Sequence, residues 1–453
     1  MKNIHFVGIG GIGMSGLAFL LKDQGVKVRG SDSKSGCNVD NLRAEGVEVI
    51  IGHKASNIDT DTDLVAYSSA IRMDNPEIVE AKKQGIKIIK RGTLLGCICQ
   101  DKKTIAVSGS HGKTTTTSFL AYLLTALGYD PALFIGGLPL NHSRNARWGK
   151  DYFVIETDES DGSFLNHHPW VSIITNVDNE HIEHYKSWDN LKQSFLKFAR
   201  QTTGKVFGCG DDQTVREILD QVEGIKYGFG PDNDIRCENV SFDGTGSSFD
   251  LLVGNKRIPS IKTPLFGEHN VLNTLAVLAV SSYLGDDLES IAKVMKDFKG
   301  TKRRFQVQQT LGGITFVDDY AHHPTEIKAV LKASCKLKPE RMIVVFQPHR
   351  FSRVKALYDE FCHCFCKVDR LIVTDIYGAS EDSNRGVEVK EFCSDIAKNT
   401  CADVQYIPKE FLAKEVPLLL KSGDLCLSLG AGDINSLIAE VAREVKEKIY
   451  GSK

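Results

Sequence analysis

The chain has 453 residues, a net charge of −2 at pH 7 and a hydrophobic fraction of 42%, which are ordinary values for a globular protein. Its length exceeds what a single hydrophobic core serves, so two to four domains are expected. The near balance of charge gives no reason to expect a nucleic acid as a partner. The N-terminus leads directly into a strand, and the most apolar segment, 271–285, is too short and too polar to span a bilayer, so membrane insertion is not expected.

Twelve cysteines raise the question of a metal site, because Cys362, Cys364 and Cys366 form a C-x-C-x-C run. Zinc sites usually combine two ligand pairs, and no second pair is present. In a helix the three positions would point in different directions. We therefore expect reduced cysteines that serve as small apolar side chains, and a cytoplasmic location.

The first elements are a strand at 4–9, a helix at 14–24 and a strand at 26–32, and the turn after the first strand is rich in glycine. Gly8, Gly10 and Gly13 form G-x-G-x-x-G, and Asp32 ends the second strand. Such a loop lets the backbone approach a pyrophosphate at a helix N-terminus. NAD and a nucleotide sugar both carry a pyrophosphate, so an NAD(P)-dependent oxidoreductase remains an alternative.

Further strands follow at 64–69 and 86–92, with a helix between them at 74–85 that Asn75 caps and Pro76 begins. We expect residues 1–98 to form a Rossmann-like domain, 99–300 a central domain resembling P-loop ATPases, and 301–453 a second Rossmann-like domain. The fold class is therefore α/β with three domains. A stretch rich in charge and glycine, 298–305, is the expected second linker.

The central domain opens with a second phosphate loop, SGSHGKTTTT, between a strand at 104–110 and a helix at 114–128. Gly109, Gly112, Lys113 and Thr114 match G-x-x-G-K-[ST], although the general P-loop has a glycine where this chain has Val107. Backbone N–H groups would cradle phosphate oxygens, Lys113 would reach the β- and γ-phosphates, and the Thr114 hydroxyl would ligate magnesium. The sequence therefore predicts a site for ATP and Mg²⁺.

The next two strands, 153–159 and 171–178, end in polar side chains that suit a metal. The first delivers Glu156, Asp158, Glu159 and Asp161, and His181 follows the second; of these, Glu156 and His181 are the favoured functional residues. Carboxylate oxygens suit magnesium, whereas one histidine alone does not make a zinc site. A solvated loop is the alternative for each single acidic residue here.

Residues 224–265 are expected to be rich in β-structure, and the apolar stretch 271–285 to be a buried helix. His269, Asn270 and Asn273 lie at its start. An asparagine there either caps the helix or bonds to the edge of an adenine. Four more strands are expected at 313–320, 341–347, 370–376 and 424–430.

The motifs GSHGKTT, ETDESDGSF, TNVDNEHIEHY, GEHNVLN, KRRF, DDYAHHPTE and FQPHRFSR occur in this order, and with them the whole chain resembles the Mur ligases. The resemblance implies a three-domain cytoplasmic enzyme of peptidoglycan synthesis that uses ATP and magnesium. GIGGIGMSG, DDYAHHPTE and QPHRFSR are similar to the branch that joins L-alanine to UDP-N-acetylmuramate. The related ligase that attaches a preformed peptide to the same nucleotide sugar is the nearest alternative.

The resemblance assigns the first loop to the pyrophosphate of the nucleotide sugar, and ATP to the second loop and the third domain. For the nucleotide sugar the expected residues are Gly8, Gly10, Gly11, Ile12, Gly13, Ser31, Asp32, Ser68 and Ser69. For ATP they are Gly109, Ser110, His111, Gly112, Lys113, Thr114, Thr115, His269, Asn270, Asn273, Arg304, Asp319 and Tyr320.

The implied reaction makes an acyl phosphate, which the amine of alanine then attacks. Lys113, Glu156, His181, His322, Arg350 and Arg353 are the expected catalytic residues, with Thr114, Glu156 and His181 around the metal. His349, Arg350 and Arg353 are expected to bind the amino acid, because two guanidinium groups spaced i, i+3 suit its carboxylate. Where relatives usually have Asp before the histidine of His181, this chain has Glu180, so no role is assigned to Glu180.

Overall fold

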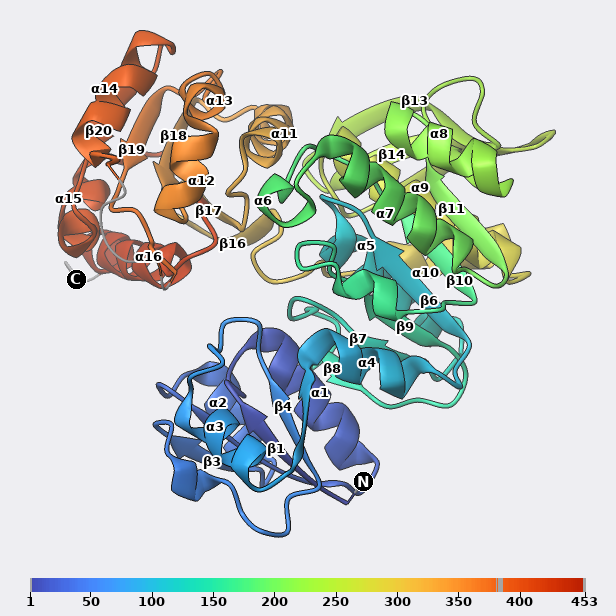
Figure 1. Ribbon diagram of the computed structural model, residues 1–453. Helices are drawn as coiled ribbons and strands as arrows, with labels where there is room; N and C mark the ends of the chain where they lie inside the picture. The colour runs from blue at the N-terminus through green and yellow to red at the C-terminus, as the bar shows by residue number, and fades with distance from the viewer. Residues whose placement is uncertain (1, 380, 382–385, 451–453) are drawn as a thin grey trace. The chain divides into compact units, whose positions relative to one another are not determined.

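A computed structural model describes residues 2–379, 381 and 386–450. It contains three β-sheets flanked by helices, which confirms the predicted α/β class with three sheet-containing domains (Figure 1). The chain divides into two compact units. The first consists of Met1–Val240, Ser248–Pro264 and Leu272–Thr301, and the second of Ser241–Ser247, Leu265–Val271 and Lys302–Lys453.

The N-terminal sheet is parallel, with the strand order β3-β2-β1-β4-β5. The chain adds β2 and β3 on one side of β1 and then adds β4 and β5 on the other side. Its elements are β1 (Asn3–Val7), α1 (Ile12–Asp23), β2 (Lys27–Asp32), α2 (Cys37–Ala44), β3 (Glu48–Ile51), β4 (Leu64–Tyr67), α3 (Pro76–Lys83), β5 (Lys87–Lys90) and α4 (Arg91–Cys99). The predicted start of α3 is confirmed, since Asn75 accepts a hydrogen bond from the Glu77 N–H and Pro76 is the first helical residue.

The central sheet has the order β15-β14-β13-β12-β11-β10-β6-β9-β7-β8. Its strands are β6 (Thr104–Ser108), β7 (Ala132–Phe134), β8 (Ala146–Arg147), β9 (Phe153–Glu156), β10 (Val171–Ile174), β11 (Lys205–Cys209), β12 (Ile225–Gly228), β13 (Ile235–Asp243), β14 (Gly246–Val253) and β15 (Lys256–Thr263). Strand β6 pairs in parallel with β10 on one side and β9 on the other. The three strands that precede the candidate ATP residues therefore end side by side.

The helices of this region include one that the sequence predicts to be buried. They are α5 (Lys113–Ala126), α6 (Ile182–Tyr185), α7 (Trp188–Arg200), α8 (Gln213–Val222), α9 (Glu268–Tyr283) and α10 (Leu288–Met295). Most apolar side chains of α9, from Val271 to Val280, are buried, which confirms that prediction. The expected β-rich stretch is also confirmed, because β12 to β15 fill residues 225–263. No helix in the described ranges is both long and apolar enough to cross a membrane.

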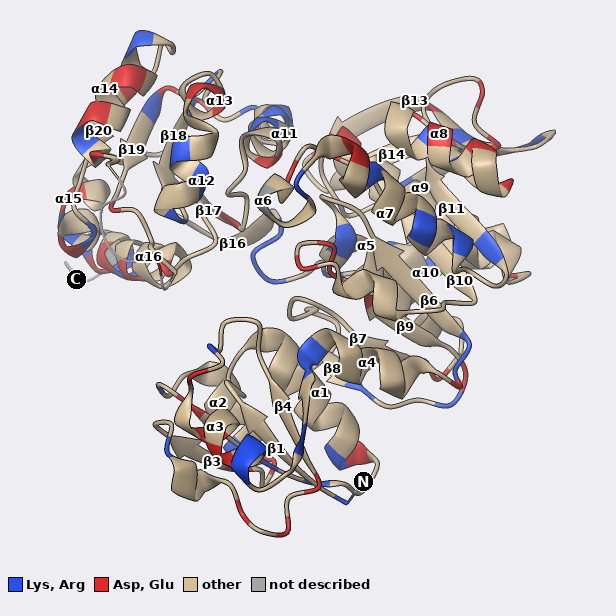
Figure 2. Cartoon of the chain, in the orientation of Figure 1, with Lys and Arg blue, Asp and Glu red and all other residues tan. Residues whose placement is uncertain are grey.

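The C-terminal sheet has the order β16-β17-β21-β18-β19-β20, in which only β16 runs antiparallel to its neighbour. Its strands are β16 (Gln306–Leu311), β17 (Ile314–Asp319), β18 (Arg341–Phe346), β19 (Arg370–Val373), β20 (Asp403–Tyr406) and β21 (Asp424–Leu429). Its helices are α11 (Pro324–Ser334), α12 (Phe351–Ala356), α13 (Tyr358–Cys362), α14 (Val389–Lys398), α15 (Leu412–Leu419) and α16 (Ile434–Tyr450). Figure 2 shows charges of both signs interspersed on helices such as α14 and α16.

The cysteine run differs from the helical arrangement considered above. Helix α13 ends at Cys362, so Cys364 and Cys366 lie beyond it. Cys362 and Cys364 are buried in the core, as expected of small apolar side chains, whereas Cys366 is exposed. The run therefore leaves the helix after Cys362 and continues into the turn before β19.

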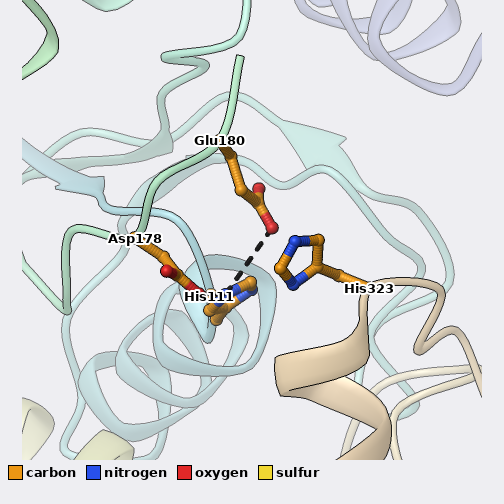
Figure 3. Close-up of side chains that lie close together, drawn as sticks. All are labelled: His111, Asp178, Glu180 and His323. Carbon is orange, nitrogen blue, oxygen red and sulfur yellow. Dashed lines mark hydrogen bonds and ion pairs between the residues drawn. The ribbon is translucent and has the colours of Figure 1, made fainter. Parts of the chain in front are cut away.

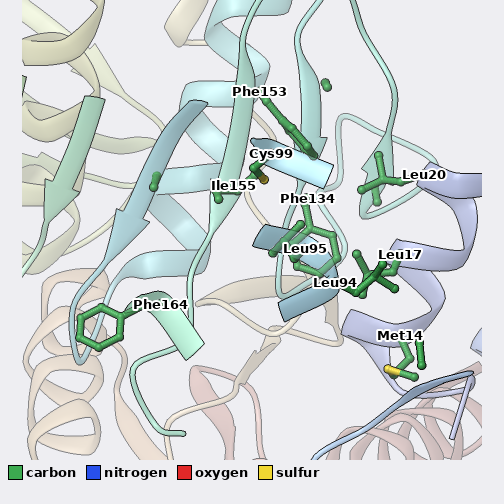
Figure 4. Packing of buried hydrophobic residues seen from close by; sticks show 14 of the residues in the cluster. Met14, Leu17, Leu20, Leu94, Leu95, Cys99, Phe134, Phe153, Ile155 and Phe164 are labelled. Atoms are coloured by element: carbon green, nitrogen blue, oxygen red, sulfur yellow. The ribbon is translucent and has the colours of Figure 1, made fainter. Parts of the chain in front are cut away.

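One hydrophobic core joins the N-terminal and central sheets (Figure 4). Helix α1 packs beside α4 and against β7 and β8, and two glycines of α4 let that helix approach residues 163–166 closely. A Cβ on Gly92 would overlap the side chain of Ser163, and one on Gly96 would lie 2.8 Å from the carbonyl oxygen of Asn166. Helix α4 therefore lies almost directly on the backbone of residues 163–166.

We predict that Gly92→Ala lowers the free energy of unfolding by about 1–3 kcal/mol, because the added methyl group overpacks this interface. Chemical denaturation followed by circular dichroism measures the change. Gly36→Ala is the matched control, since that glycine has an extended backbone with no atom within 4 Å of a new Cβ. Equal stability of the two variants would contradict the interpretation of the interface.

Candidate active site

The first glycine loop is held by strand β2. The N–H groups of Gly8 and Ile9 both donate to the Ser31 carbonyl, and the Gly10 N–H donates to Asp32 Oδ2 at 2.8 Å. Gly8 has a φ of +80°, which favours glycine. Gly11 then caps α1, so the first-turn N–H groups of Ile12 and Gly13 open toward a ligand. Asp32 thus anchors the loop.

The side chain of Ser31 lies away from the loop, in a buried polar network that the sequence did not reveal. Its hydroxyl is 2.6 Å from Glu77 Oε2 and 3.0 Å from His53 Nδ1. Glu77 is fully buried and also contacts His5 Nε2 at 3.2 Å and Asn57 Nδ2 at 2.5 Å. Burial alone would raise the pKa of Glu77, but hydrogen bonds from His5, Ser31 and Asn57 bring it below its usual value.

Ser68 and Ser69 follow β4 at the same edge of the sheet. The Cβ of Ser68 lies 3.3 Å from the position of a Cβ on Gly8, and Ser69 is exposed. Ser68 therefore lies beside the glycine loop, and Ser69 follows it in the chain.

The second loop is anchored by the residues that follow β10. The Ser110 and His111 N–H groups donate to the carbonyl and side-chain oxygens of Asn176, and Thr175 Oγ1 donates to the His111 carbonyl at 2.6 Å. Gly109 and Gly112 have φ values of +131° and +81°. These bonds fix a turn whose N–H groups lead into the N-terminus of α5, where Thr115 is buried in the first turn.

Lys113 folds back over this loop. Its Nζ donates to the Gly109 carbonyl at 2.5 Å, to the Ser110 carbonyl at 3.0 Å and to Glu159 Oε1 at 2.8 Å. Burial lowers the pKa of Lys113, but Glu159, Asp158 and Glu156 more than offset this and raise it above its usual value. Lys113 is therefore a stable cation at the loop.

Glu159 is the least exposed carboxylate at this site, although the sequence favoured Glu156 over it. It is 3% exposed, and burial raises its pKa to about 7 despite the attraction of Lys113. Its Oε2 atom is buried and makes no hydrogen bond within the described part of the chain. The acidic run at the end of β9 indicates its place in the sequence, but not its burial.

The residues expected around the metal are brought together in part. Thr114 Oγ1 donates to Glu156 Oε1 at 2.8 Å, and Glu156 Oε2 accepts the Gly136 N–H at 2.7 Å. His181 caps the short helix α6, and its Nε2 lies 3.8 Å from Glu159 Oε1. A hydroxyl beside a carboxylate supplies the hard oxygens that Mg²⁺ prefers, so Thr114 and Glu156 fit this ion.

Three side chains gather beside the loop in a group that the sequence did not predict (Figure 3). His111 Nε2 lies 3.1 Å from Asp178 Oδ2 and 3.7 Å from Glu180 Oε1. Glu180, which had no assigned role, also approaches His181 Nε2 at 3.6 Å. These carboxylates orient both histidines around the phosphate loop.

The asparagines at the start of α9 lie in different surroundings. Asn273 packs against Gly112 of the phosphate loop and accepts a hydrogen bond from Thr116 Oγ1 at 3.2 Å. Asn270 is 5% exposed, and its Nδ2 donates to the Phe266 carbonyl. The ring of His269 lies against Gly267. Only Asn273 of these three lies in the same unit as the phosphate loop.

In the second unit, Asp319 ties the start of the C-terminal sheet together. Its oxygens accept the Phe305 N–H at 2.6 Å and the Ala321 N–H at 2.7 Å, and burial raises its pKa to about 6. Tyr320 lies between two guanidinium groups, with Arg303 and Arg304 at 5.0 and 5.1 Å from its ring centre. The side chain of Asp319 thus accepts hydrogen bonds from two backbone N–H groups, and the ring of Tyr320 positions the guanidinium group of Arg304.

Helices α11 and α12 bring the residues expected to bind the amino acid together. His322 packs edge-to-face on His349, which stacks on Tyr377 and lies 3.2 Å from Arg353 Nη1. Burial lowers the pKa of His322 to about 3 and that of His349 to about 4, so both rings are neutral. Arg350 is exposed and has a φ of +69° at the N-cap of α12.

Three family models match successive parts of the chain. Residues 3–103 match the Mur ligase family, catalytic domain, residues 107–281 the Mur ligase middle domain, and residues 303–432 the Mur ligase, glutamate ligase domain. The chain belongs to the Mur ligase family. This Mur ligase is 41% identical to the UDP-N-acetylmuramate–L-alanine ligase of Syntrophus aciditrophicus, over 99% of this chain and 94% of that protein.

Solved structures agree with this assignment. The UDP-N-acetylmuramate-alanine ligase of Thermotoga maritima is 31% identical with a TM-score of 0.84, and the alignment covers 100% of both chains. A murein peptide ligase of Psychrobacter arcticus has a TM-score of 0.75 at 23% identity, over 98% of this chain and 99% of that one. The second likeness shows the fold alone.

We predict that His322 remains neutral well below pH 6. Its folded-state pKa is depressed, so the unfolded chain takes up a proton below about pH 6.5 and the folded chain does not. Stability that is present above pH 6.5 is therefore lost as the pH falls toward 3, by at most about 1.4 kcal/mol per pH unit.

His322→Asn should remove this contribution, because the amide can still donate to the Tyr320 carbonyl that lies 3.0 Å from His322 Nδ1. Urea denaturation of both proteins at pH 7.5 and pH 5 measures how much the free energy of unfolding changes with pH in each of them. The same pH dependence in the wild type and the variant would contradict the assignment.

Proposed function

We propose that this Mur ligase uses ATP to join L-alanine to the lactyl carboxylate of UDP-N-acetylmuramate, in peptidoglycan precursor synthesis. The observation that carries the proposal is the phosphate loop, in which Lys113 contacts Glu159 and Thr114 contacts Glu156, in a chain 41% identical over nearly its full length to a ligase with that name. Both nucleotides are made inside the cell, so we place the reaction in the cytoplasm.

The reaction has two steps. A carboxylate does not react with an amine in neutral water, so its oxygen first attacks the γ-phosphorus of ATP, which releases ADP and leaves an acyl phosphate. The amine of alanine then attacks the acyl carbon, and the resulting tetrahedral intermediate expels phosphate to form the amide. Phosphoryl transfer depends on positioning and charge neutralisation more than on covalent participation of the protein.

Lys113 supplies a fixed positive charge at the β- and γ-phosphates, and the amides at the start of α5 supply hydrogen bonds. Thr114, Glu156 and His181 would hold magnesium, which adds positive charge at the phosphates when bound. Asn273 lies against the loop and contributes to nucleotide binding.

The first glycine loop binds the pyrophosphate of the nucleotide sugar in this proposal. Residues 1–98 then form the nucleotide-sugar domain and 99–300 the ATP domain. Residues 301–453 supply groups for both ATP and the amino acid, with Arg304 and Tyr320 assigned to the nucleotide.

For the amino acid we assign His349, Arg350 and Arg353, and for His322 the role of a hydrogen-bond acceptor. Its Nδ1 lies on the Tyr320 carbonyl and therefore carries the proton, which leaves Nε2 as the acceptor. A pKa near 3 makes it a weak base, so general base catalysis by His322 is not part of the proposal.

Two alternatives are less well supported. A solved structure of a ligase that attaches a preformed peptide is 28% identical over 67% of this chain, against 31% over 100% for the alanine ligase structure. An NAD(P)-dependent oxidoreductase accounts for the first loop but leaves Lys113, Thr114 and Glu156 without a role.

The deciding experiment measures phosphate release from ATP with UDP-N-acetylmuramate and, in turn, L-alanine, glycine, L-serine and a tripeptide. We expect turnover with L-alanine. Lys113→Ala should abolish ATP turnover while UDP-N-acetylmuramate binds nearly as before, because the two anions occupy different loops. Preference for the tripeptide would support the peptide ligase, and a parallel loss of nucleotide-sugar affinity would mean that the loops are wrongly assigned.

A second variant tests the amino-acid site. Arg350→Ala should raise the KM for alanine by roughly ten- to a hundredfold, because a charge-assisted hydrogen bond contributes about 1.5–3 kcal/mol. The KM for ATP should change far less. An alanine KM within about twofold of the wild type would refute the assignment of Arg350 to the carboxylate.

A further inference from the structure

Residues 136–141, which we call the clamp segment, begin at the candidate metal site, and the proposed function gives them no role of their own. The Gly136 N–H donates to Glu156 Oε2 at 2.7 Å. A Cβ on Gly137 would lie 2.8 Å from the methyl carbon of Thr114. The first two residues of the clamp segment therefore lie directly on the two residues that fit Mg²⁺.

At the other end of the clamp segment, the side chain of Asn141 bonds to residues 297–301, which we call the exit segment. Its Nδ2 donates to the Asp297 carbonyl at 3.1 Å, and its Oδ1 accepts the Lys299 N–H at 2.7 Å. An asparagine side chain both donates and accepts, so it can hold two backbone groups at once. These partners are 156 and 158 positions from Asn141 in the sequence, so the contact comes from the tertiary fold.

Backbone contacts continue this pairing toward the metal site. The Leu140 N–H donates to the Gly300 carbonyl at 3.0 Å, and Pro139 forms an antiparallel bridge with Thr301. Thr301 is 1% exposed, and its methyl carbon lies 3.2 Å from the position of a Cβ on Gly137. The clamp and exit segments therefore lie side by side along nearly the whole length of the clamp segment.

The exit segment is also fixed to the helix that follows the phosphate loop. The buried ring of Phe298 stacks on Phe119 of α5, with the ring centres 4.4 Å apart and an angle of 6° between the planes. The clamp and exit segments both belong to the first unit, which the chain leaves after Thr301. The exit segment is thus anchored up to the point at which the chain passes into the second unit.

We infer that Asn141 is a positioning residue for magnesium-dependent nucleotide binding, and that it acts through the Gly136 amide on Glu156. The inference rests on the proposed function for the identity of the nucleotide. The Gly136 N–H holds one oxygen of Glu156, while the other oxygen accepts the Thr114 hydroxyl. A carboxylate that is oriented in advance loses less conformational freedom when it binds an ion.

Two consecutive glycines explain why this amide needs a distant anchor. Glycine has the greatest backbone freedom of any residue, so Gly136 and Gly137 hold an N–H group in place only if both of their flanks are fixed. Strand β7 fixes one flank, and the pairing of Asn141 with the exit segment fixes the other. In the opposing interpretation, Asn141 only stabilises the first unit and does not affect the metal site.

Calorimetric titration of the full chain with ADP, with Mg²⁺ and with EDTA, separates these interpretations. We expect Asn141→Ala to weaken ADP binding in Mg²⁺ by roughly three- to tenfold, which is the contribution of one neutral hydrogen bond. Binding in EDTA should stay within about twofold, as should binding of UDP-N-acetylmuramate. Asn141→Asp keeps the acceptor for the Lys299 N–H and should therefore weaken Mg²⁺-dependent binding less.

Tyr122→Phe is the matched control. The Tyr122 hydroxyl donates to the Val294 carbonyl at 2.8 Å, so this bond ties α5 to the chain shortly before the exit segment. The variant removes a hydrogen bond from the same part of the first unit, but at a point outside the clamp segment. We expect it to bind ADP like the wild type, with and without Mg²⁺.

Hydrogen exchange of the Lys299 amide provides a second readout. Coupling between two sites is reciprocal, so if the pairing with the exit segment favours binding of ADP and Mg²⁺, that binding must also stabilise the pairing. ADP with Mg²⁺ should therefore slow exchange of this amide in the wild type, and should slow it less in Asn141→Ala.

Mg²⁺-dependent ADP binding by Asn141→Ala within about twofold of the wild type would overturn the inference. So would equal losses in Asn141→Ala and Tyr122→Phe, or equal losses in Mg²⁺ and in EDTA, because a loosened first unit would then explain the effect. Should neither Asn141 variant fold, unchanged Lys299 exchange when ADP and Mg²⁺ bind the wild type overturns it instead. Failure of the wild type to bind ADP at all would reject the proposed function itself.

Discussion

The buried ammonium group of Lys113 is the interaction on which the central site depends. Removing a charge from water costs several kcal/mol, even in a protein that relaxes around it. Glu159 and the carbonyls of Gly109 and Ser110 offset this cost, and each of them must then keep its position. The left-handed turns at Gly109 and Gly112 make those carbonyls available, since they direct the backbone around the ammonium group.

This requirement extends to the neighbouring strands. The loop keeps its shape because Thr175 and Asn176 at the end of β10 bond to His111, and Glu159 keeps its place because β9 ends beside β6. A central parallel strand with a neighbour on each side is therefore the minimum scaffold for this site. This arrangement is an example of the general rule that ligands bind at the carboxyl ends of the strands in open α/β sheets.

Much of this could be predicted from the sequence because it is local. The strand–turn–helix pattern around Gly109–Thr114 and the cap at Asn75 each involve residues only a few positions apart, and both occur as expected. Thr114 and Glu156 also lie close together as predicted, because β6 and β9, which lead to them, are adjacent strands. The sequence alone does not show that Asp32 holds Gly10, because a strand-end carboxylate in this role looks the same as one that binds the nucleotide sugar.

The residues that sequence analysis missed depend on contacts between distant segments. Glu77 is a charged residue in the first turn of a helix, which normally faces water, and only the approach of His5 and Ser31 from two strands buries it. Arg91 meets Asp158 across 67 positions, and nothing in either local sequence indicates the pair. Ser31 lies next to Asp32, but successive strand residues point to opposite faces, so one serves the buried network and the other the loop.

The hydrophobic core that runs from α1 and α4 into β7 and β9 has a consequence for any attempt to dissect the chain. A fragment that ended near residue 98 would leave Met14, Leu17, Leu94 and Leu95 without the aromatic side chains that cover them, among them Phe134 and Phe153. Its newly exposed apolar surface would favour self-association over the monomeric state. The N-terminal sheet is thus separate by topology, but its apolar side chains share one core with the central sheet.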